Sequence, residues 1–405
     1  MEPSESYNEA QTRASDRPRG EIAIGYSRCA VAAEAFAEAA KMVKTKIKSA
    51  RIEALILLFD FDGIDAVQLR EYTNRFFMPT HFIAVKASPL IAEGQVFAKG
   101  LCVVALGGVQ SLSGGFSEGG NTRENTEKML WRMAQEVQRP RKLYFGASSI
   151  AETDLSDHIK GLEVSVGKKA PMINVYFDPE SADRTVKIVH TEGACARGAA
   201  GMSLFDAVQV AIKSGAGFHP LGSSGIIGRD EERHNILTTV NGKDAADFYK
   251  KYFGEKIVED VGYAKRVFRR YPLGVKKNAF YYDVIKPHMI EERKRLQCMQ
   301  DVRGDEVRIM IPTREGILTE ARSAALEMRG KLGTDKAVLM FDVKERQRFF
   351  GTHYDRCVAA VKDALGPVPM IGGVFYALGF MFDSDDVALG HSVSEHSFAL
   401  LALGS

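Results

Sequence analysis

The chain lacks the features that mark secreted, zinc-binding and membrane-spanning proteins. Its five cysteines are scattered, odd in number and form no C-x-x-C pair, which excludes a disulfide framework or a zinc site of ordinary spacing. No apolar run approaches the ~18 residues of a membrane span. The first 20 residues lack the apolar core of a signal peptide. We therefore expect a soluble cytoplasmic protein with no membrane partner, which begins with a disordered tail over residues 1–20.

An excess of one charge is also lacking. The 54 basic and 52 acidic residues leave a net charge of +2. The densest basic run, Lys265 to Arg270, is short and is interpreted as one solvated helix face. Without a basic stripe interleaved with aromatics, we expect no nucleic-acid partner. The hydrophobic content of 45% supplies a large core, and 405 residues predict about two to three domains.

What the chain does contain is a pattern that occurs near both ends. Each copy starts with a continuous apolar run that ends in Phe-Asp, typical of a strand buried on both faces. A helix-like stretch and two further apolar runs follow, and each copy closes on Leu-Gly. The runs are Ala54–Asp60, Phe82–Ala87 and Cys102–Gly108 in the first copy, and Ala337–Asp342, Met370–Tyr376 and Ala399–Ser405 in the second.

This internal repeat predicts an α/β fold. A strand–helix–strand step implies a parallel pair, beside which the last strand adds as an antiparallel neighbour. We expect two pseudo-symmetric halves with mixed sheets packed face to face and helices outside. The seam between such halves is a common place for a small molecule to bind. Asp60 and Asp342 stand at the two Phe-Asp exits, where carboxylates either line a cleft or, as we favour, cap the next helix.

Periodicity and turn residues place the other elements. The Gly- and Ser-rich segment 107–120 matches neither a P-loop nor a dinucleotide fingerprint and predicts a mobile surface loop. Short strands are expected at 143–145, 175–177, 186–189 and 307–311. Helices are expected at 31–47, from 63 onward, and at 125–137, 204–212, 244–253, 317–332 and 352–365.

Four segments of the C-terminal part carry a family resemblance. Leu237–Tyr249 has a short hairpin followed by a helix with N-G-x-x-A and a tyrosine, and Tyr271–Val275 contains P-L-G. Ile371–Tyr376 contains a Gly-Gly turn, and His396–Phe398 closes the pattern. In order and spacing these segments resemble the FIST family of sensory domains. The resemblance implies a FIST N-terminal-like domain over residues 21–255 and a FIST C-terminal-like domain over residues 256–405.

The chain also departs from the family pattern. Ala377–Gly379 stand where an acidic residue is expected after the Gly-Gly turn, Ser397 replaces an asparagine, and residues 110–201 match weakly. If the acidic residue and the asparagine contact the ligand in the family, this protein binds a different ligand or none.

Six residues are candidates for binding a small ligand. His219 precedes a proline in a glycine-rich loop, and Arg229 closes a run of glycines whose N–H groups could form an anion nest. Gly372 and Gly373 would let a ligand approach the backbone beside Tyr376, and the alternative is a bulge or tight bend. His396 belongs to the closing motif of the resemblance.

Two alternative functions stay open. Cys195 lies among small residues near Arg197, so it is a weak candidate for the nucleophile of a thiol-dependent enzyme, and an incidental cysteine is the plainer interpretation. Some FIST members resemble haem-based gas sensors, and an axial ligand could come from His190, His219 or His396. Nothing in their spacing selects one, and no metal site of standard spacing is present.

The leading hypothesis is a ligand-binding sensory module for signal transduction. No triad, paired acids or metal cluster points to catalysis in this sequence, so an enzyme is the less favoured class. Because the chain contains no kinase, cyclase or receptor segment, we expect a stand-alone protein whose output passes through a signalling partner.

Overall fold

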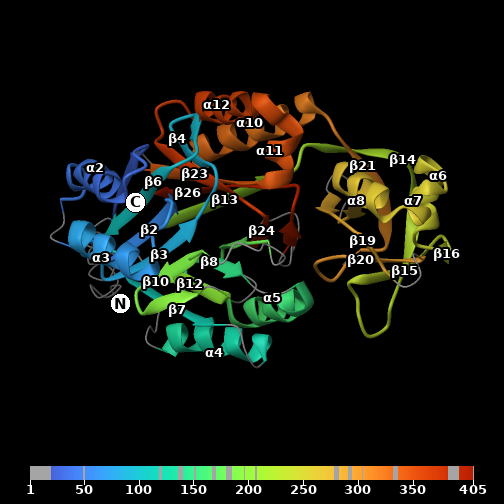
Figure 1. The fold of residues 1–405 in the computed structure, drawn as a ribbon, viewed down its shortest axis with the longest axis horizontal. Helices are drawn as coiled ribbons and strands as arrows, with labels where there is room; N and C mark the ends of the chain where they lie inside the picture. Colours follow the sequence, from blue (N-terminus) through green and yellow to red (C-terminus); the bar gives the residue numbers. More distant parts are fainter. Residues whose placement is uncertain are drawn as a thin grey trace, which may run out of the picture.

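The computed structural model describes residues 20–48, 51–117, 121–135, 140–149, 152–166, 170–178, 185–195, 197–205, 208–277, 282–290, 294–302, 304–331, 336–381 and 392–404. Apart from Gly20, the expected tail lies outside these residues. The chain forms a large body of sheets covered by helices and a smaller lobe beside it (Figure 1).

The body consists of three copies of one α/β unit. The first has β1 Glu21–Ser27, α2 Ala32–Lys44, β2 Ala54–Asp60, α3 Ala66–Phe77, β3 His81–Lys86, β4 Leu90–Ala92, β5 Gln95–Phe97 and β6 Gly100–Gly107. The second has β7 Ser111–Ser117, α4 Thr122–Gln135, β8 Leu143–Ser149, α5 Glu152–Val166, β9 Met172–Tyr176, β10 Ile188–His190, β11 Gly193–Cys195 and β12 Gly198–Leu204.

The third copy is interrupted by the lobe. Its first strand is β13 Gln209–Gly215, and it resumes almost a hundred residues later. The remainder has α10 Arg314–Lys331, β22 Lys336–Val343, α11 Lys344–Phe350, the 3-10 turn η1 Gly351–His353, α12 Tyr354–Leu365, β23 Met370–Phe375, β24 Ala377–Met381, β25 Ser392–Ser394 and β26 Phe398–Gly404.

Each copy builds four strands of a six-stranded sheet and receives a hairpin from another copy. The strand orders β1-β6-β2-β3, β7-β12-β8-β9 and β13-β26-β22-β23 are equivalent. The hairpin β4–β5 extends the third sheet beside β23, β10–β11 extends the first beside β3, and β24–β25 extends the second beside β9. This cyclic exchange of hairpins ties the three copies into one body.

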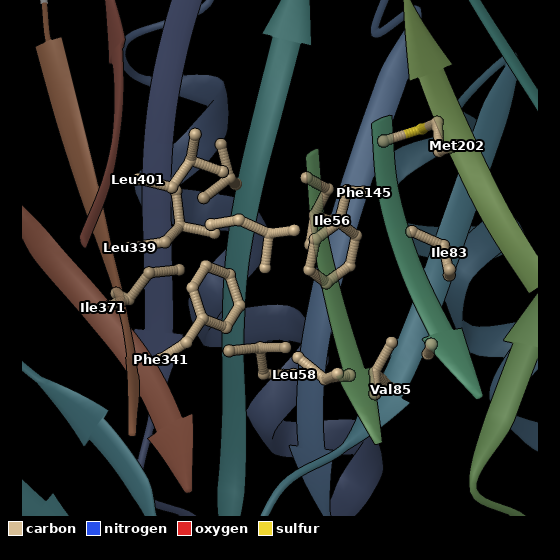
Figure 2. Packing of buried hydrophobic residues seen from close by; sticks show 14 of the residues in the cluster. Ile56, Leu58, Ile83, Val85, Phe145, Met202, Leu339, Phe341, Ile371 and Leu401 are labelled. Carbon is tan, nitrogen blue, oxygen red and sulfur yellow. The ribbon is translucent and has the colours of Figure 1, made fainter. Parts of the chain in front are cut away.

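The inner faces of the three sheets share one apolar core. Ile56 and Ile83 come from the first sheet, Phe145 from the second, and Leu339 and Phe341 from the third (Figure 2). Phe145 and Phe341 meet with ring centroids 5.5 Å apart. Strands β2 and β22, which come from the continuous apolar runs of the repeat, are buried on both faces, as expected.

Helices cover the outer face of each sheet, around the periphery of the body in Figure 1. Phe36 of α2 and Leu69 of α3 pack on the first sheet, whereas Ala321 of α10 and Val358 of α12 pack on the third. Asp65 begins α3 with a reciprocal capping box to Gln68, which satisfies two backbone N–H groups at the helix start.

The lobe has its own sheet and core. It contains β14 Phe218–Arg229, β15 Ile236–Val240, β16 Lys243–Asp244, α6 Asp247–Phe253, α7 Lys256–Glu259, α8 Val261–Arg270, β17 Leu273–Lys276, β18 Tyr282–Ile285, β19 His288–Ile290, β20 Arg295–Gln297 and β21 Glu306–Pro312. Phe248 of α6, Ile257 of α7 and Phe268 of α8 share one hydrophobic cluster. The expected domain boundary at residues 255 and 256 therefore falls inside the lobe.

The lobe joins the body through β14 and β21, which pair antiparallel. Gly217 makes the exit from β13 possible. Its φ is +69°, and a Cβ there would come within 2.4 Å of the Ile317 Cα. A side chain would therefore be strained and would clash with α10.

The predicted α/β class, the mixed sheets and the outer helices are confirmed, and the two ends of the chain do form equivalent units. The structure adds a third unit that the sequence did not reveal. The expected loop over 107–120 contains strand β7, and the expected helix over 204–212 is wrong because β12 and β13 occupy most of it. Glycines obscured β7 and β12, since the His190 ring lies beside Gly115 and the Tyr144 ring fills the space beside Gly201.

The two Phe-Asp exits are not equivalent in three dimensions. Leu58 faces the central core and Phe59 faces the helices, whereas Phe341 faces the central core. The pairing with the closing strand agrees. Ala54 pairs with Leu106 and Ala337 with Leu403, the residues before the two closing glycines, so Ala54 and Ala337 are equivalent. Five residues further along, Phe59 is then equivalent to Asp342. Because the side-chain period of a strand is two, this one-residue slip moves Asp342 to the helix side.

Candidate functional site

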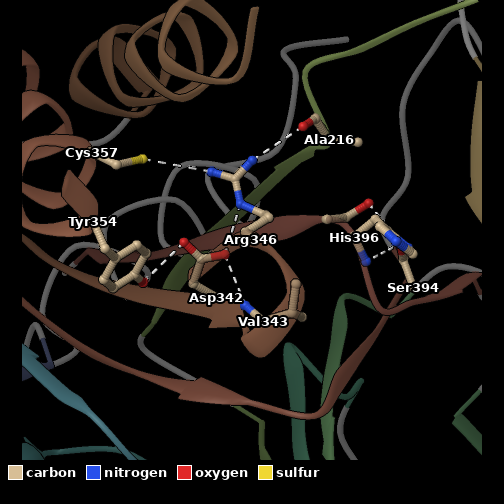
Figure 3. A network of polar contacts seen from close by, with 9 residues as sticks. Ala216, Asp342, Val343, Arg346, Tyr354, Cys357, Ser394 and His396 are labelled. Atoms are coloured by element: carbon tan, nitrogen blue, oxygen red, sulfur yellow. Dashed lines mark hydrogen bonds and ion pairs between the residues drawn. The ribbon is translucent and has the colours of Figure 1, made fainter. Parts of the chain in front are cut away.

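Helix α11 follows β22 directly and forms the wall of the body that faces the lobe. Arg346 points inward, whereas Glu345 and Arg348 line the space toward the lobe. Arg346 Nε donates to Asp342 Oδ1 at 2.8 Å, and the two side chains are 1% and 0% exposed. A buried ion pair therefore anchors α11 to the strand before it (Figure 3).

The remaining polar atoms of this pair also have partners. Tyr354 donates its hydroxyl to Asp342 Oδ2 at 3.0 Å, and the N–H of Val343 donates to Oδ1 at 2.8 Å. Arg346 Nη1 donates to the carbonyl of Ala216 at 3.1 Å, where the chain leaves the body for the lobe. Burial alone would lower the pKa of Arg346, but the charge of Asp342, the neighbouring Cys357 and Tyr354 and the hydrogen bond to Asp342 together offset it, and the pKa is raised. The guanidinium therefore stays charged in its buried site.

Ion pairs and hydrogen bonds connect the lobe to the third repeat. Lys286 Nζ lies 2.5 Å from Glu395 Oε1, and Arg269 Nε lies 3.2 Å from Glu345 Oε1. His396 Nε2 is 2.8 Å from the carbonyl oxygen of Arg269. Since a carbonyl only accepts, this ring nitrogen carries the proton.

Strand β25 adds a second group of contacts to this seam. Ser392 donates to Asp283 Oδ1 at 2.5 Å, and Ser394 donates to the carbonyl of Val284 at 2.9 Å. The N–H of Val393 donates to Gln300 Oε1 at 2.6 Å. Burial raises the pKa of Asp283. These side chains are buried, so the contacts hold β25 and the lobe in one geometry.

A cavity of about 270 Å³ opens between the lobe and the body. We call it the lobe cleft. Its lobe side is lined by Val261, Ala264, Lys265, Phe268, Arg269, Lys286, Pro287, His288 and Met289, and its body side by Asp178, Lys344, Glu345, Arg348 and Tyr376. The walls combine an apolar surface with charged groups, the usual composition of a small-molecule site.

Two of the lysines that line the lobe cleft have no polar partner among the described residues, whereas the third does. Lys286 is paired with Glu395 and lies 5.6 Å from the centre of the Tyr376 ring. Within the described part of the chain, Lys265 and Lys344 make no ion pair or hydrogen bond. One comes from the lobe and the other from the body, so an anion between them would contact both parts.

A second cavity, of about 460 Å³, adjoins the lobe cleft at Glu345. We call it the arginine hollow. It shares Arg269, Glu345 and Arg348 with the lobe cleft and adds Phe218, Arg270, Pro312, Arg314, Ile317, Arg346, Phe349 and His396. The two cavities meet at Glu345, whose carboxylate binds both Arg269 and Arg348.

The structure divides the predicted ligand residues among several places. Tyr376 lines the lobe cleft and His396 lines the arginine hollow. Gly372 and Gly373 line neither cavity. A Cβ at Gly372 would come within 1.9 Å of the Met340 carbonyl oxygen and one at Gly373 within 2.5 Å of the Ala87 Cβ, so these glycines serve close packing of strands.

The expected anion nest at Arg229 is wrong. The glycines before Arg229 lie along strand β14 rather than in a loop, and its guanidinium binds the Gly304 carbonyl and, at 3.1 Å, Asp305. His219 is exposed on the same strand, where its ring covers Gly316. Neither residue lines the lobe cleft or the arginine hollow.

The thiol and haem candidates find no suitable setting. Cys195 is buried in the central core, and burial raises its pKa to about 11, so little thiolate exists at neutral pH. His190 is buried against Gly115 and Gly193, and burial lowers its pKa. His396 uses Nε2 for the Arg269 carbonyl, and His219 is exposed. These residues do not fit an axial haem ligand in an apolar slot.

Sequence reasoning missed most of the cleft residues. Lys265 and Arg269 belong to the basic run that was interpreted as a solvated helix face, and Phe268 between them carried the missed signal. Phe268 and Ala264 form the buried side of α8, while the cations on its exposed side face the body across the cleft. Nothing in the sequence around Lys344 and Glu345 indicates a binding site, because they line the cleft only through the way the lobe is inserted.

Neither a metal-binding cluster nor a membrane-spanning helix occurs in the part of the chain that the structure describes. Among the described residues, no three His, Cys, Asp or Glu side chains gather in a way that could hold a metal ion. No helix within the same residues has the length and apolarity needed to cross a membrane.

Comparison with known proteins identifies one part of the chain. No curated protein matches it. A solved structure described as "Cyanuric acid hydrolase: evolutionary innovation by structural concatenation" aligns over 95% of this chain and 100% of its own, at 10% identity and a TM-score of 0.31, too distant a likeness to support an argument. Residues 245–379, which include nearly all of the lobe cleft, match the FIST C domain.

Proposed function

We propose that this protein is a small-molecule-sensing module that binds its ligand in the lobe cleft and signals through a partner protein. The observation that supports this proposal is the position of the cleft between two parts of the molecule. The lobe and the body each contribute apolar surface and one unpaired lysine, Lys265 and Lys344. A ligand that contacts both favours one relative position of the two parts.

The lining favours a small organic acid as the ligand. Val261, Met289 and Tyr376 offer apolar surface, and the unpaired ammonium groups offer a site for a carboxylate. A charged hydrogen bond at such a site contributes about 1.5–3 kcal/mol, about tenfold or more in affinity. The match of residues 245–379 to the FIST C domain agrees with a ligand-binding role for this region.

A matched pair of probes tests the proposal. We expect aromatic carboxylates such as benzoate and 3-phenylpropionate to raise the melting temperature of the full chain in step with occupancy, and their neutral amides to have no effect. Lys344→Met should weaken carboxylate binding about tenfold, whereas Lys41→Met, at an exposed lysine of α2, should not change it. Stabilisation that is equal for acid and amide, or absent for every acid at millimolar concentration, contradicts the proposal.

A further inference from the structure

The arginine hollow gathers more positive charge than its surroundings neutralise. Among the described residues that line it, Glu345 is the one acidic residue, and His396 also lines it. Five of the lining residues are arginines, Arg269, Arg270, Arg314, Arg346 and Arg348.

Three of these arginines already have anionic partners. Arg346 is paired with Asp342, and Arg269 and Arg348 share Glu345. Arg270 lies over the Tyr271 ring, with its guanidinium carbon 5.8 Å from the ring centre. Neither Arg270 nor Arg314 forms an ion pair with any described residue. The hollow therefore offers two unpaired guanidinium groups beside two that share a single carboxylate.

The start of α10 adds to the positive potential. Arg314 is the first residue of this helix, and Thr313 caps it by accepting the N–H of Gly316 at 3.0 Å. Pro312, Arg314 and Ile317 all line the hollow. The positive end of the helix dipole therefore faces the same cavity.

His396 supplies a hydrogen-bond acceptor. Its side chain is 2% exposed, and burial lowers its pKa, so the ring is neutral near pH 7. Because Nε2 donates to the Arg269 carbonyl, Nδ1 carries a lone pair, and Nδ1 has no partner among the described residues. An acceptor without a partner, on a residue that lines a cavity together with five arginines, suits a ligand that is anionic and also carries a proton to donate.

We propose that the arginine hollow is a binding site for a protonated phosphate group. The guanidinium forks of Arg270 and Arg314 bind phosphoryl oxygens, as planar donors do in charge-assisted pairs. The P–O–H of the same group donates to His396 Nδ1. Inorganic phosphate keeps a proton at neutral pH and sulfate does not, so the site discriminates between two anions of similar size and shape.

Calorimetry on the full chain tests this assignment with three anions at pH 7. We expect inorganic phosphate to bind at least tenfold more tightly than sulfate. Glycerol 3-phosphate separates the two sources of the group when it is compared with inorganic phosphate at pH 6, where about half of the ester keeps its proton. Binding that matches inorganic phosphate indicates an esterified ligand, and weaker binding indicates the free ion. No heat from either phosphate at millimolar concentration overturns the proposal, and equal affinity for phosphate and sulfate overturns the role of His396.

Variants on one helix locate the site. Arg314→Met should weaken phosphate binding about tenfold or more, whereas Arg322→Met, on the exposed side of α10 away from the hollow, should leave it unchanged. Equal loss in both variants, or none in Arg314→Met, would place the anion elsewhere. Lys344→Met is expected to keep phosphate binding, which distinguishes this site from the lobe cleft.

Discussion

One equivalent position on the second strand of each copy faces the covering helices, and it carries a different type of side chain in each copy. Phe59 fills it in the first copy, Ser148 in the second and Asp342 in the third. Phe59 packs in an apolar cluster, whereas Asp342 forms a buried ion pair. The central core is apolar in all three, so the difference is confined to the outer layer.

The second copy uses neutral polar groups at this position. Ser148 Oγ lies 2.7 Å from His158 Nε2 and 3.0 Å from the side-chain nitrogen of Asn174. Thr126 Oγ1 lies 2.8 Å from His158 Nδ1. All four side chains are buried, so this cluster lies away from solvent and serves the packing of α4 and α5 on their sheet.

The comparison teaches where the scaffold has been adapted. The third copy receives the lobe, and its polar position anchors α11, the helix that carries Glu345 and Arg348 to both cavities. A buried ion pair is a weak source of stability but holds its partners in one geometry. We infer that Asp342 and Arg346 position α11, and that the other two copies need no such anchor.

Removing the anchor is expected to have the largest effect. Asp342→Ala leaves Arg346 buried without a counter-ion, which should lower the free energy of unfolding by about 3–5 kcal/mol. Asp60→Ala is the matched control, because Asp60 ends the equivalent strand with a Lys99 partner that is 34% exposed. We expect it to cost about 1 kcal/mol. Urea unfolding measures both, and equal losses would contradict the comparison.

Replacing both charges should restore part of the stability. Asp342→Leu combined with Arg346→Met leaves no unpaired charge, so the double variant should be at least about 2 kcal/mol more stable than Asp342→Ala. The remaining loss comes from the Tyr354 hydroxyl, which then lacks its acceptor. If the double variant were as unstable as Asp342→Ala, the loss in the single variant would not come from the unpaired charge of Arg346.

Because His158 of the second copy is buried, we expect the free energy of unfolding to depend on pH. Burial lowers the pKa of His158 to about 3, against about 6.5 in an unfolded chain. Below about pH 6.5 the unfolded state takes up a proton that the folded state does not, so stability falls as pH falls. At pH 5 this amounts to about 2 kcal/mol relative to pH 7.

His158→Gln should remove that part of the pH dependence. Urea unfolding at pH 7 and pH 5 gives the change in stability for each protein, and the wild type should lose about 2 kcal/mol more than the variant. An equal loss in both would show that His158 is protonated in the folded protein, contrary to its buried contacts with Ser148 and Thr126.

Much of this fold was predictable from the sequence, because buried strands and amphipathic helices leave clear patterns. The repeated ends, α10, α12 and the apolar strand runs were placed correctly. In the second copy α4, β8, β9 and β10 were also placed, but β7 and β12 were not, since they contain glycine and alanine where Tyr144 and His190 need space. Those small residues are indistinguishable from a loop in sequence.

The site was less predictable than the fold. Tyr376 and His396 were selected and lie in the two cavities, but Lys265, Lys344 and Arg314 were not. These residues come together because the lobe is inserted within the third copy and folds back on α11. The sequence also did not show that Phe59 and Phe341 face opposite sides of their sheets. Both strands are apolar on both faces, so the pattern of residues does not indicate which face each side chain occupies.

Hydrogen exchange of α11 tests the central claim most directly. Peptides covering Lys344–Phe350 should exchange faster in Asp342→Ala than in the wild type, while peptides covering α3 in the first copy keep their rates. That result would show that the buried ion pair holds the helix shared by both cavities. Unchanged exchange in α11, with Arg346 left unpaired, would contradict it.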